Sequence, residues 1–478
     1  MRKNLKLPLK AILINFAIVI AFASCEKETI YTGTEKVLRF SEDTVAFDTV
    51  FTTIGSATYS FKVYNTVDDK VVINSISLGN LTDSPFRLNV DGYSTKRAEQ
   101  ISLKGGDSLH IFVEVTIDPQ NQDSPLFIKD SILFNVNNNL SKVMLTAYGQ
   151  DVVKLKNQHL QTTSLTANKP YLVYDTLFVD KGVTVTLEAG ATFYMHRGSR
   201  VIVDGTLIAN GEFEKPILFV GDRLEDWYKD AVGAWGDIYL SPKSVNSSLN
   251  YVTIKNGDNG LLCDSVGLVG DTLNLSNLRI EHIQNTGLLL QNSVAKVKNS
   301  LFGNCSKNSV ALYFGGSYIF THCTISNSGN GNTTRSGSAL YVTDFYKNDE
   351  GVTVTNPLKE AWFRNTIITG SYSTEIDLDF SEATASTASY LFQNCYLSLS
   401  KSFDTTNEQH YISIVQSGDL KLLSKDNFNY HIDSTSVARD AGDIVFGNEV
   451  PLDFDKVSRV IDNKPDLGMY EYVKSEKK

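Results

Sequence analysis

The stretch SNLRIEH at residues 276–282 shows the pattern that decides the fold of this chain. In it, Asn277 comes just before a short, mostly apolar run, and the same pattern returns through the second half of the sequence. Two of the steps between anchors are 22 and 23 residues, one of 43 is close to two repeats, and those of 27 and 29 leave room for loops. A fixed period in this range is typical of a solenoid, in which each repeat stacks on the last and buries a continuous core. The anchors are Asn250, Asn277, Asn299, His322, Asn365 and Asn394.

The residue type at the anchors suits a bend between two strands. Asn tolerates the left-handed backbone conformation better than other residues that carry a side chain. Stacked Asn side chains can bond to one another and to the backbone of the bend, which satisfies polar groups that would otherwise be buried unpaired. The aliphatic residues after the anchors can then stack in columns. We therefore interpret the anchors as structural. The aliphatic residues concerned are Val252, Ile254, Leu278, Ile280, Leu301, Ile325 and Ile367.

Three pieces of sequence before and within the repeats carry a family resemblance. They are VDGTLIANG at 203–211 with PILF at 216–219, the pair Trp235-Gly236, and YVTIKNG at 251–257. Together they resemble the first turns of a right-handed parallel β-helix of the pectate-lyase-like superfamily, over about residues 160 to 400. The resemblance implies a β-helix domain at residues 153–438. Within it, residues 326–362 interrupt the period, and SALYVTDF at 338–345 suggests one turn with long loops. Loops that project from a scaffold often bind ligands.

The C-terminal residues 439–478 contain two short runs that resemble the closing segment of many secreted bacterial β-helix proteins. A solenoid must cover its last open edge, so we expect a cap here. Its carboxylates are expected to bond to turns and to Arg459; the alternative is that they gather around a cation such as Ca²⁺. The cap residues are Asp453, Asp455, Arg459, Asp466 and Glu471.

Residues 37–152 show the period-two alternation of half-buried strands. Examples are Tyr59, Phe61 and Val63, and turn clusters such as Gly105-Gly106-Asp107 separate the strands. About seven short strands in this length favour an immunoglobulin-like sandwich. The expected fold is therefore all-β, with an N-terminal Ig-like β-sandwich, a right-handed parallel β-helix and a C-terminal cap.

The N-terminus has the form of a targeting segment. Residues 1–24 combine basic residues with an apolar run from Ala11 to Phe22, which is too short to span a bilayer comfortably. The run ends just before Cys25 and resembles a bacterial lipobox, in which the thiol of the Cys receives a lipid; an ordinary secretory signal is the alternative. Residues 25–36 would then be a tether. With the β-helix, this resembles envelope lipoproteins of the Bacteroidota and implies a lipid anchor in the outer membrane, on a face that the sequence does not specify.

Composition excludes some classes of partner and site. The net charge of −10 should repel nucleic acid, and the first 24 residues hold four basic residues and no acid, so the remainder is more acidic still. Cys263, Cys305, Cys323 and Cys395 lack a metal-ligand spacing and are expected to be small buried residues, so no metal site or cofactor is predicted.

Two groups of polar residues are the candidates for catalysis. Asp377 and Asp379 in EIDLDF share one face of a strand, with Glu375 in line, as the carboxylate pair of a glycoside hydrolase requires. Arg279 and Glu281 lie on one face of the strand after Asn277, and His282 on the other. Polar residues at alternate positions are also what a solvent-facing strand needs. We therefore expect a surface ion pair for Arg279 and Glu281.

These observations lead to three hypotheses for function. The first is a non-catalytic, lipid-anchored envelope protein whose β-helix surface binds a glycan or an envelope protein. The second is a polysaccharide lyase or glycoside hydrolase that acts on an acidic or plant-type glycan. The third is a structural rod in an envelope assembly. Membership of a fold alone does not transfer an activity.

Overall fold

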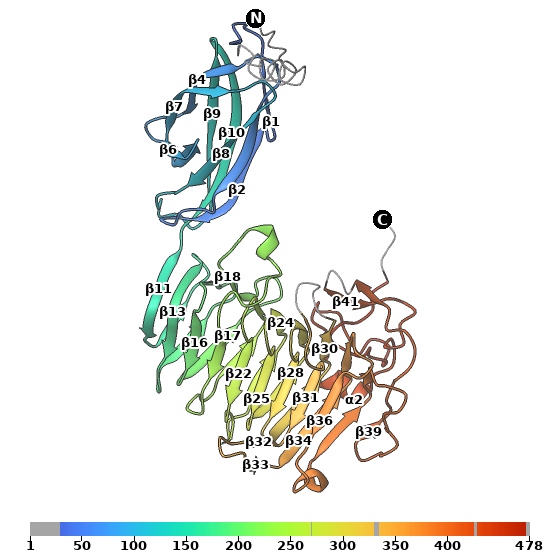
Figure 1. Ribbon diagram of the computed structural model, residues 1–478. Helices are drawn as coiled ribbons and strands as arrows, with labels where there is room; N and C mark the ends of the chain where they lie inside the picture. Colours follow the sequence, from blue (N-terminus) through green and yellow to red (C-terminus); the bar gives the residue numbers. More distant parts are fainter. Residues whose placement is uncertain (1–28, 269, 329–333, 425–427, 475–478) are drawn as a thin grey trace, which may run out of the picture. The chain divides into compact units, whose positions relative to one another are not determined.

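The computed structural model describes residues 29–268, 270–328, 334–424 and 428–474 (Figure 1). The predicted signal segment and Cys25 lie outside these ranges. The contacts divide the chain into two compact units, Met1–Asp151 and Val152–Lys478. Among the described residues, no helix is both long and apolar enough to cross a membrane.

The N-terminal unit is an Ig-like sandwich of two five-stranded sheets. Alternate residues point into one shared core, as Phe61 and Val63 do on one sheet and Val143 and Leu145 do on the other. The strands number ten where the sequence suggested about seven, because β1 and β6 have only three residues each and are too short to show alternation. The first sheet has the order β1 (Leu38–Phe40), β3 (Tyr59–Asn65), β8 (Ser108–Val115), β5 (Phe86–Val90), β6 (Tyr93–Thr95). The second has the order β2 (Thr44–Phe51), β10 (Asn139–Gln150), β9 (Leu126–Val136), β4 (Val71–Leu78), β7 (Arg97–Leu103).

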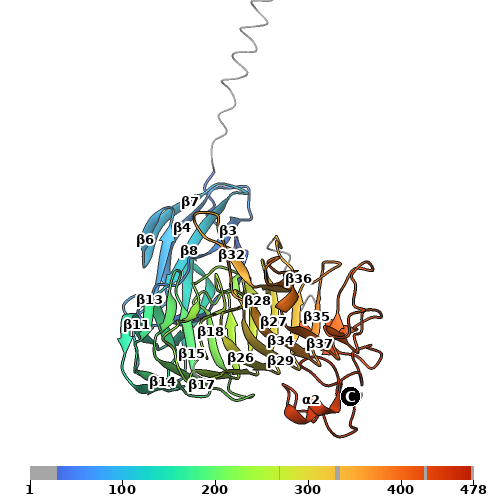
Figure 2. The same ribbon diagram turned by 90° about the horizontal axis from the view of Figure 1, so that it is seen from below.

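The second unit is a three-sided parallel β-helix, whose coils follow one another from green to orange in Figures 1 and 2. It begins with β11 (Val153–Leu160), which pairs in parallel with β13 (Tyr171–Val179). Strand β13 bends at Asp175 (φ 58°) and so starts two of the three faces. Face A continues through β15 (Thr192–Met195), β18 (Ile217–Gly221), β21 (Val252–Lys255), β24 (Arg279–Ile283), β27 (Leu301–Cys305), β30 (Thr324–Asn327), β35 (Ile367–Gly370) and β38 (Tyr396–Leu397).

The other two faces are also built of parallel strands that pair from one coil to the next. Face B continues from β13 through β16 (Arg200–Val203), β19 (Ile238–Leu240), β22 (Leu261–Asp264), β25 (Leu288–Gln291), β28 (Val310–Tyr313), β31 (Leu340–Thr343) and β36 (Ile376–Asp379). Face C comprises β12 (Thr163–Leu165), β14 (Thr184–Leu187), β17 (Thr206–Asn210), β20 (Ser248–Asn250), β23 (Leu273–Ser276), β26 (Val294–Lys298), β29 (Gly316–Thr321), β34 (Leu358–Arg364), β37 (Tyr390–Gln393) and β39 (Tyr411–Ile412).

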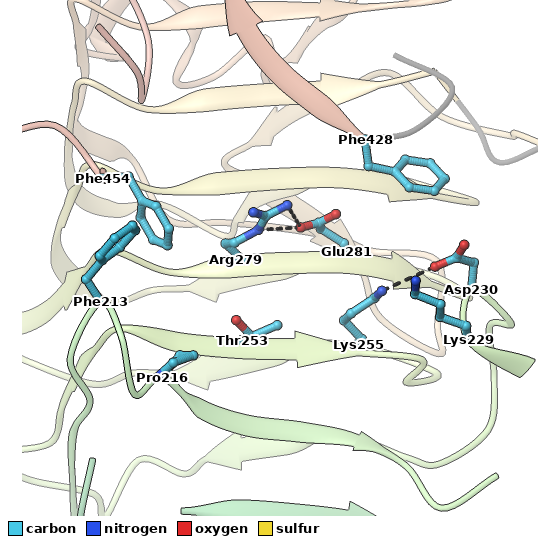
Figure 3. Close-up of a pocket in the computed structure, with 10 residues that line it drawn as sticks. All are labelled: Phe213, Pro216, Lys229, Asp230, Thr253, Lys255, Arg279, Glu281, Phe428 and Phe454. Atoms are coloured by element: carbon cyan, nitrogen blue, oxygen red, sulfur yellow. Dashed lines mark hydrogen bonds and ion pairs between the residues drawn. The ribbon is translucent and has the colours of Figure 1, made fainter. Parts of the chain in front are cut away.

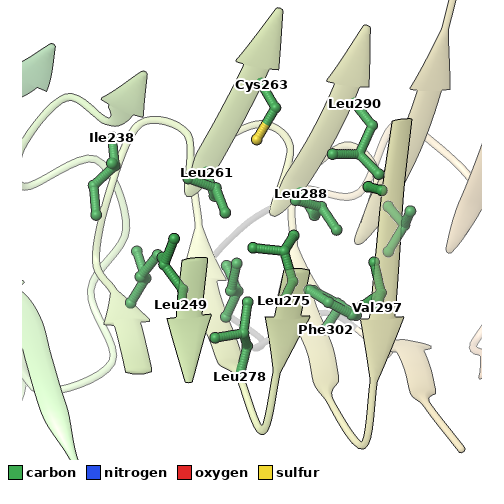
Figure 4. Packing of buried hydrophobic residues seen from close by; sticks show 14 of the residues in the cluster. Ile238, Leu249, Leu261, Cys263, Leu275, Leu278, Leu288, Leu290, Val297 and Phe302 are labelled. Atoms are coloured by element: carbon green, nitrogen blue, oxygen red, sulfur yellow. The ribbon is translucent and has the colours of Figure 1, made fainter. Parts of the chain in front are cut away.

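In-register stacking of like residues forms the core of the β-helix. Ile238, Leu261 and Leu288 occupy aligned positions on successive coils of face B and are fully buried (Figure 4). Val310 continues the same column on the next coil. On face C the rings of Phe320, Phe363 and Phe392 stack with centroid distances of 4.9 Å. Apolar columns of this kind bury each coil against its neighbours, which explains why a single coil could not fold alone. The four described cysteines are free and buried, as predicted.

The Asn anchors mark the bend from face C to face A. Asn277, Asn299, His322, Asn365 and Asn394 all have left-handed φ angles of 48° to 54°. Neighbouring side chains form a ladder: Asn299 Nδ2 donates to Asn277 Oδ1 at 2.6 Å, and Asn365 Nδ2 lies 3.0 Å from His322 Nε2.

Asn250 departs from this pattern. It ends β20, and the left-handed residue of its coil is the next one, Tyr251 (φ 47°). The strand pairing explains the shift, because Thr253 aligns with Arg279 and so Tyr251 aligns with Asn277. Asn250 still joins the ladder, since its Oδ1 accepts a hydrogen bond of 2.7 Å from Asn277 Nδ2.

The interruption of the period at residues 326–362 is one coil with insertions, as expected. Its strands are β31 and β34, and a hairpin of β32 (Phe345–Lys347) and β33 (Thr353–Thr355) projects between them. At the base of the hairpin, the ring of Phe314 packs against that of Tyr346 with a centroid distance of 4.9 Å.

The C-terminal segment, residues 428–472, packs along the ladder and over face A. It contains the strand β41 (Asn429–Ile432), which pairs with β40 (Leu422–Ser424), and the short helix α2 (Ile444–Glu449). It touches face A over several coils, through contacts of Phe454 with Tyr251 and of Gly468 with Asn365. Of the predicted cap residues, Arg459 bonds to the side of the β-helix through Asn299, and the others bond within the segment.

The buried charges of the C-terminal segment bond to turns and to Arg459. Arg459 is 1 % exposed and donates to Glu471 Oε1 at 2.5 Å and to Asn299 Oδ1 at 2.8 Å. Asp453 accepts from the backbone N–H groups of Val457 and Glu471, at 2.7 and 2.8 Å.

The two remaining cap residues also have partners within the segment. Asp466 accepts from the backbone N–H groups of Asp440 and Tyr472, both at 2.6 Å, and Asp455 lies 2.6 Å from His431 Nε2. Burial raises the pKa of Asp453 and of Asp466 from the ordinary value of an aspartate, despite these bonds.

Candidate functional site

A groove of about 570 Å³ lies on the outer surface of face A (Figure 3). Its floor consists of the outward side chains of two neighbouring strands, Thr253 and Lys255 on β21 and Arg279 and Glu281 on β24. Alternation places these four on the outside, because Val252, Ile254 and Ile280 between them are buried in the core.

Aromatic and charged side chains form the sides of the groove. Phe213 and Phe454 lie at the end of the strands where the ladder runs, and their rings meet edge to face at a centroid distance of 6.0 Å. Lys229 and Asp230 lie at the opposite side, on the loop that follows β18 and holds the 3-10 helix η1 (Asp226–Tyr228). The ring of Phe428 lies above the floor on the side of the later coils (Figure 3).

The charges of the groove are largely paired. Arg279 Nε donates to Glu281 Oε1 at 2.7 Å, and Lys255 Nζ lies 3.2 Å from Asp230 Oδ1. The first pair forms as expected for its spacing, but it does not lie on an open surface, because the Glu281 side chain is only 4 % exposed. Among the described residues, Lys229 is the cation of the groove that makes no ion pair.

His282 lies beneath the groove. The sequence predicted only that it lies on the strand face opposite to Arg279 and Glu281. Its left-handed φ of 56° continues a second column of bends, in which Asn256 and Asn304 occupy the aligned positions. Its side chain is 0 % exposed, packs edge to face on Phe428 at 4.3 Å and has Nε2 3.4 Å from Asp230 Oδ1. Burial, with help from nearby Lys255, lowers its pKa to about 4, so the imidazole is neutral at pH 7.

The second candidate pair, Asp377 and Asp379, lies on face B and away from the groove. Both are exposed on the outside of β36, and Tyr341 Oη on the neighbouring strand β31 donates to Asp379 Oδ2 at 3.1 Å. Partial burial and the charge of Asp379 raise the pKa of Asp377, and burial raises the pKa of Tyr341 to about 12.

Glu375 does not lie in line with that pair, contrary to the expectation. It precedes β36, is 0 % exposed and forms an ion pair of 2.6 Å with Arg335. It also accepts hydrogen bonds from the backbone N–H groups of Tyr372 and Ala339, at 2.7 and 2.9 Å. The strand begins only at Ile376, so the two-residue alternation does not extend back to Glu375. This carboxylate ties Arg335 and the backbone of Ala339 and Tyr372 together.

The sequence pattern missed most of the groove. Phe213, Lys229, Asp230, Phe428 and Phe454 belong to loops and to the C-terminal segment, outside the repeats. Of its lining, only Arg279 and Glu281 stood out, through their shared strand face. No local signal marks the others, since they meet only because the chain folds back onto face A.

Comparison with known proteins supports the fold. Residues 136–325 match the family model described as a right handed beta helix region. The β-helix is right-handed. The matched residues include the floor of the groove but neither the loop at 326–362 nor the C-terminal segment. No curated protein matches the sequence.

Three solved structures show distant likenesses to this chain. A protein of unknown function from Porphyromonas gingivalis W83 is 14% identical with a TM-score of 0.18, over 27% of this chain and 50% of that chain. This chain thus spans half the length of that protein. The ASH/PapD-like domain of human CEP192 is 9% identical, with a TM-score of 0.18, over 26% of this chain and 96% of that one. A family 123 glycoside hydrolase from Clostridium perfringens is 6% identical, with a TM-score of 0.18, over 25% and 30%.

Proposed function

We propose that this protein is a lipid-anchored cell-envelope protein whose β-helix binds an acidic glycan in the face A groove, without turnover. The observation that carries the proposal is the make-up of the groove, which has aromatic sides, a polar floor and one unpaired cation. Sugar rings offer C–H faces that pack on aromatic side chains and hydroxyls that bond to polar ones.

The charge balance of the groove favours an acidic sugar. Lys229, Lys255 and Arg279 line it together with the carboxylates of Asp230 and Glu281. Because Lys255 and Arg279 already contact these carboxylates, Lys229 is the group best able to meet a uronate. An acidic protein that attracts an acidic ligand needs such a local cation, since its overall charge of −10 is repulsive.

The same pairing argues against catalysis in the groove. A glycoside hydrolase needs one carboxylic acid that donates a proton and a second carboxylate opposite it. Here Glu281 accepts from Arg279, and Asp230 contacts Lys255, so both carboxylates are engaged by cations. His282 is buried under Phe428 and does not line the groove.

The envelope location rests on sequence features outside the described residues. The basic and apolar segment that ends at Cys25 supports a lipid anchor, most simply in the outer membrane. The sandwich would then be the spacer between the lipid and the β-helix.

A panel of purified acidic and neutral polysaccharides tests the proposal. We expect the protein to bind at least one acidic member without producing new reducing ends or unsaturated uronates. Failure to bind any glycan, with capture of an envelope protein instead, would show that the ligand is a protein and not a glycan. Failure to bind either would leave the β-helix as a structural rod.

A second candidate, glycoside hydrolysis on face B, has one observation in its favour. Asp377 and Asp379 lie two residues apart on one strand, roughly 7 Å, and the pKa of Asp377 is raised. A carboxylate gap of roughly 6.5 to 9.5 Å is typical of inverting enzymes. Turnover on the panel that disappears in both Asp377→Asn and Asp379→Asn would establish this activity. Turnover that persists in the double variant would exclude the pair.

A further inference from the structure

The outer surface of face A changes abruptly from open to covered along one register column. In this column, Thr192, Leu218, Thr253 and Arg279 pair in succession on β15, β18, β21 and β24, and all four are partly exposed. The next three aligned residues on β27, β30 and β35 are fully buried, at 0%, 1% and 1% exposure; they are Leu301, Thr324 and Ile367.

The C-terminal segment causes this change. Leu301 belongs to a buried cluster with Tyr430, Met469 and Tyr470. The backbone N–H of Met469 donates to Thr324 Oγ1 at 3.0 Å, which ties the segment to the next coil.

The neighbouring register column is covered in the same way. A Cβ on Gly303 of β27 would lie 3.0 Å from Tyr430 Oη, so only a glycine fits under this ring without a shift. Gly303 aligns with Glu281 of the groove floor, one coil earlier. The groove therefore ends where Tyr430 begins to cover face A.

The sides of the groove leave a single direction for an extended ligand. Phe213 and Phe454 close one end of the strands, and Lys229 and Asp230 close the other (Figure 3). Phe428 lies towards the covered coils. Among the residues that the structure describes, the direction of the earlier coils, past Leu218 and Thr192, is the one that remains partly exposed on face A. The open part spans three coil spacings, roughly 15 Å.

We infer that the C-terminal segment makes the groove selective for the end of a glycan chain, an inference that rests on the proposed function. One terminus of a linear acidic glycan enters across β15 and β18 and stops against Phe428 and the cluster around Tyr430. An internal part of the chain cannot bind in the same pose, because its continuation would have to pass through side chains that bury Leu301 and Thr324. The segment that resembles a cap thus determines the binding mode.

The stoichiometry of binding to chains of different length tests this inference. Full-length protein in detergent is titrated with short, intermediate and long fractions of polygalacturonate, or of the acidic glycan that binds in the panel. We expect the number of protein molecules per glycan chain at saturation to be the same for all three fractions. A number that grows in proportion to chain length would overturn the inference and leave the proposed function intact. Absence of binding to every glycan would overturn both.

A pair of variants tests whether the bound glycan lies in the groove. Lys229→Ala should weaken binding at least tenfold for all fractions, because it removes the unpaired cation. Lys296→Ala, an exposed cation on β26 of face C, should leave both affinity and stoichiometry unchanged. If the two variants behaved alike, the bound site would lie elsewhere and the inference would be wrong.

Discussion

The guanidinium of Arg459 donates a hydrogen bond of 2.8 Å to the side-chain oxygen of Asn299, a residue 160 positions earlier in the chain. This bond joins the C-terminal segment to the Asn ladder of the β-helix. Because the same guanidinium binds Glu471, one buried residue holds both the segment's own fold and its place on face A.

Replacement of Arg459 should therefore loosen the whole C-terminal segment. Arg459→Ala leaves the Glu471 carboxylate buried without its cation, and losing one partner of a buried ion pair costs about 3–5 kcal/mol. We expect urea unfolding to show this loss, and amide exchange to rise first at Gly468 and Met469. Arg439→Ala is the control, since that side chain is 39% exposed. Equal stability of the two variants would contradict the structural role.

The buried neutral His282 should make stability depend on pH in acid. Its pKa falls from an ordinary 6.5 to about 4 in the folded protein, so between these values the unfolded chain binds a proton that the native state does not. The free energy of unfolding should thus decrease as the pH falls from 6.5 to 4, by about 3 kcal/mol in all, and should not change through this residue at higher pH.

The variant His282→Asn isolates that contribution from those of other titrating groups. Asn fits the left-handed bend, because Asn256 and Asn304 occupy the aligned positions of the neighbouring coils. The difference in unfolding free energy between the variant and the parent protein should vary with pH only below 6.5. A difference that stays constant from pH 4 to 8 would show that the pKa of His282 is the same in the folded and the unfolded protein, and would contradict the prediction.

A bulky residue on the floor of the groove should block the ligand without disturbing the core. Thr253 points outward from β21 and is partly exposed, so Thr253→Trp adds volume only inside the groove. We expect at least a tenfold weaker affinity for the glycan, equivalent to about 1.4 kcal/mol, in equilibrium binding. Thr186→Trp, at a partly exposed position on β14 of face C, is the matched control. Equal affinities for the two variants would place the site outside the groove.

The proposed lipid anchor depends on a single thiol, that of Cys25. Cys25→Ala should abolish both labelling by fatty acid and association with the membrane fraction, because no other residue offers the lipobox thiol. Cys263→Ala, which changes a thiol buried on face B, should keep both. Labelling that survives in Cys25→Ala would indicate an ordinary secretory signal in place of a lipoprotein.

Local chemistry explains which features the sequence alone could predict. The left-handed bends at Asn277, Asn299 and Asn365 were predictable because a left-handed φ angle restricts the type of residue at the bend itself. The alternation in Phe61 and Val63 likewise marked strands of the sandwich. Asn250 shows the limit of this logic, since a shift of one residue moved the bend to Tyr251 and only strand pairing revealed it.

By itself, the sequence determined the all-β class, the order of sandwich and β-helix, and the column of bends, because each depends on residues close together in the chain. Only the tertiary structure decided where the C-terminal segment lies and what it does. Phe428, Tyr430, Phe454 and Arg459 reach face A through contacts with coils more than a hundred residues away, and no period or spacing records such a contact. The groove has a closed end because the C-terminal segment buries Leu301 and Thr324 but leaves the earlier coils of face A open.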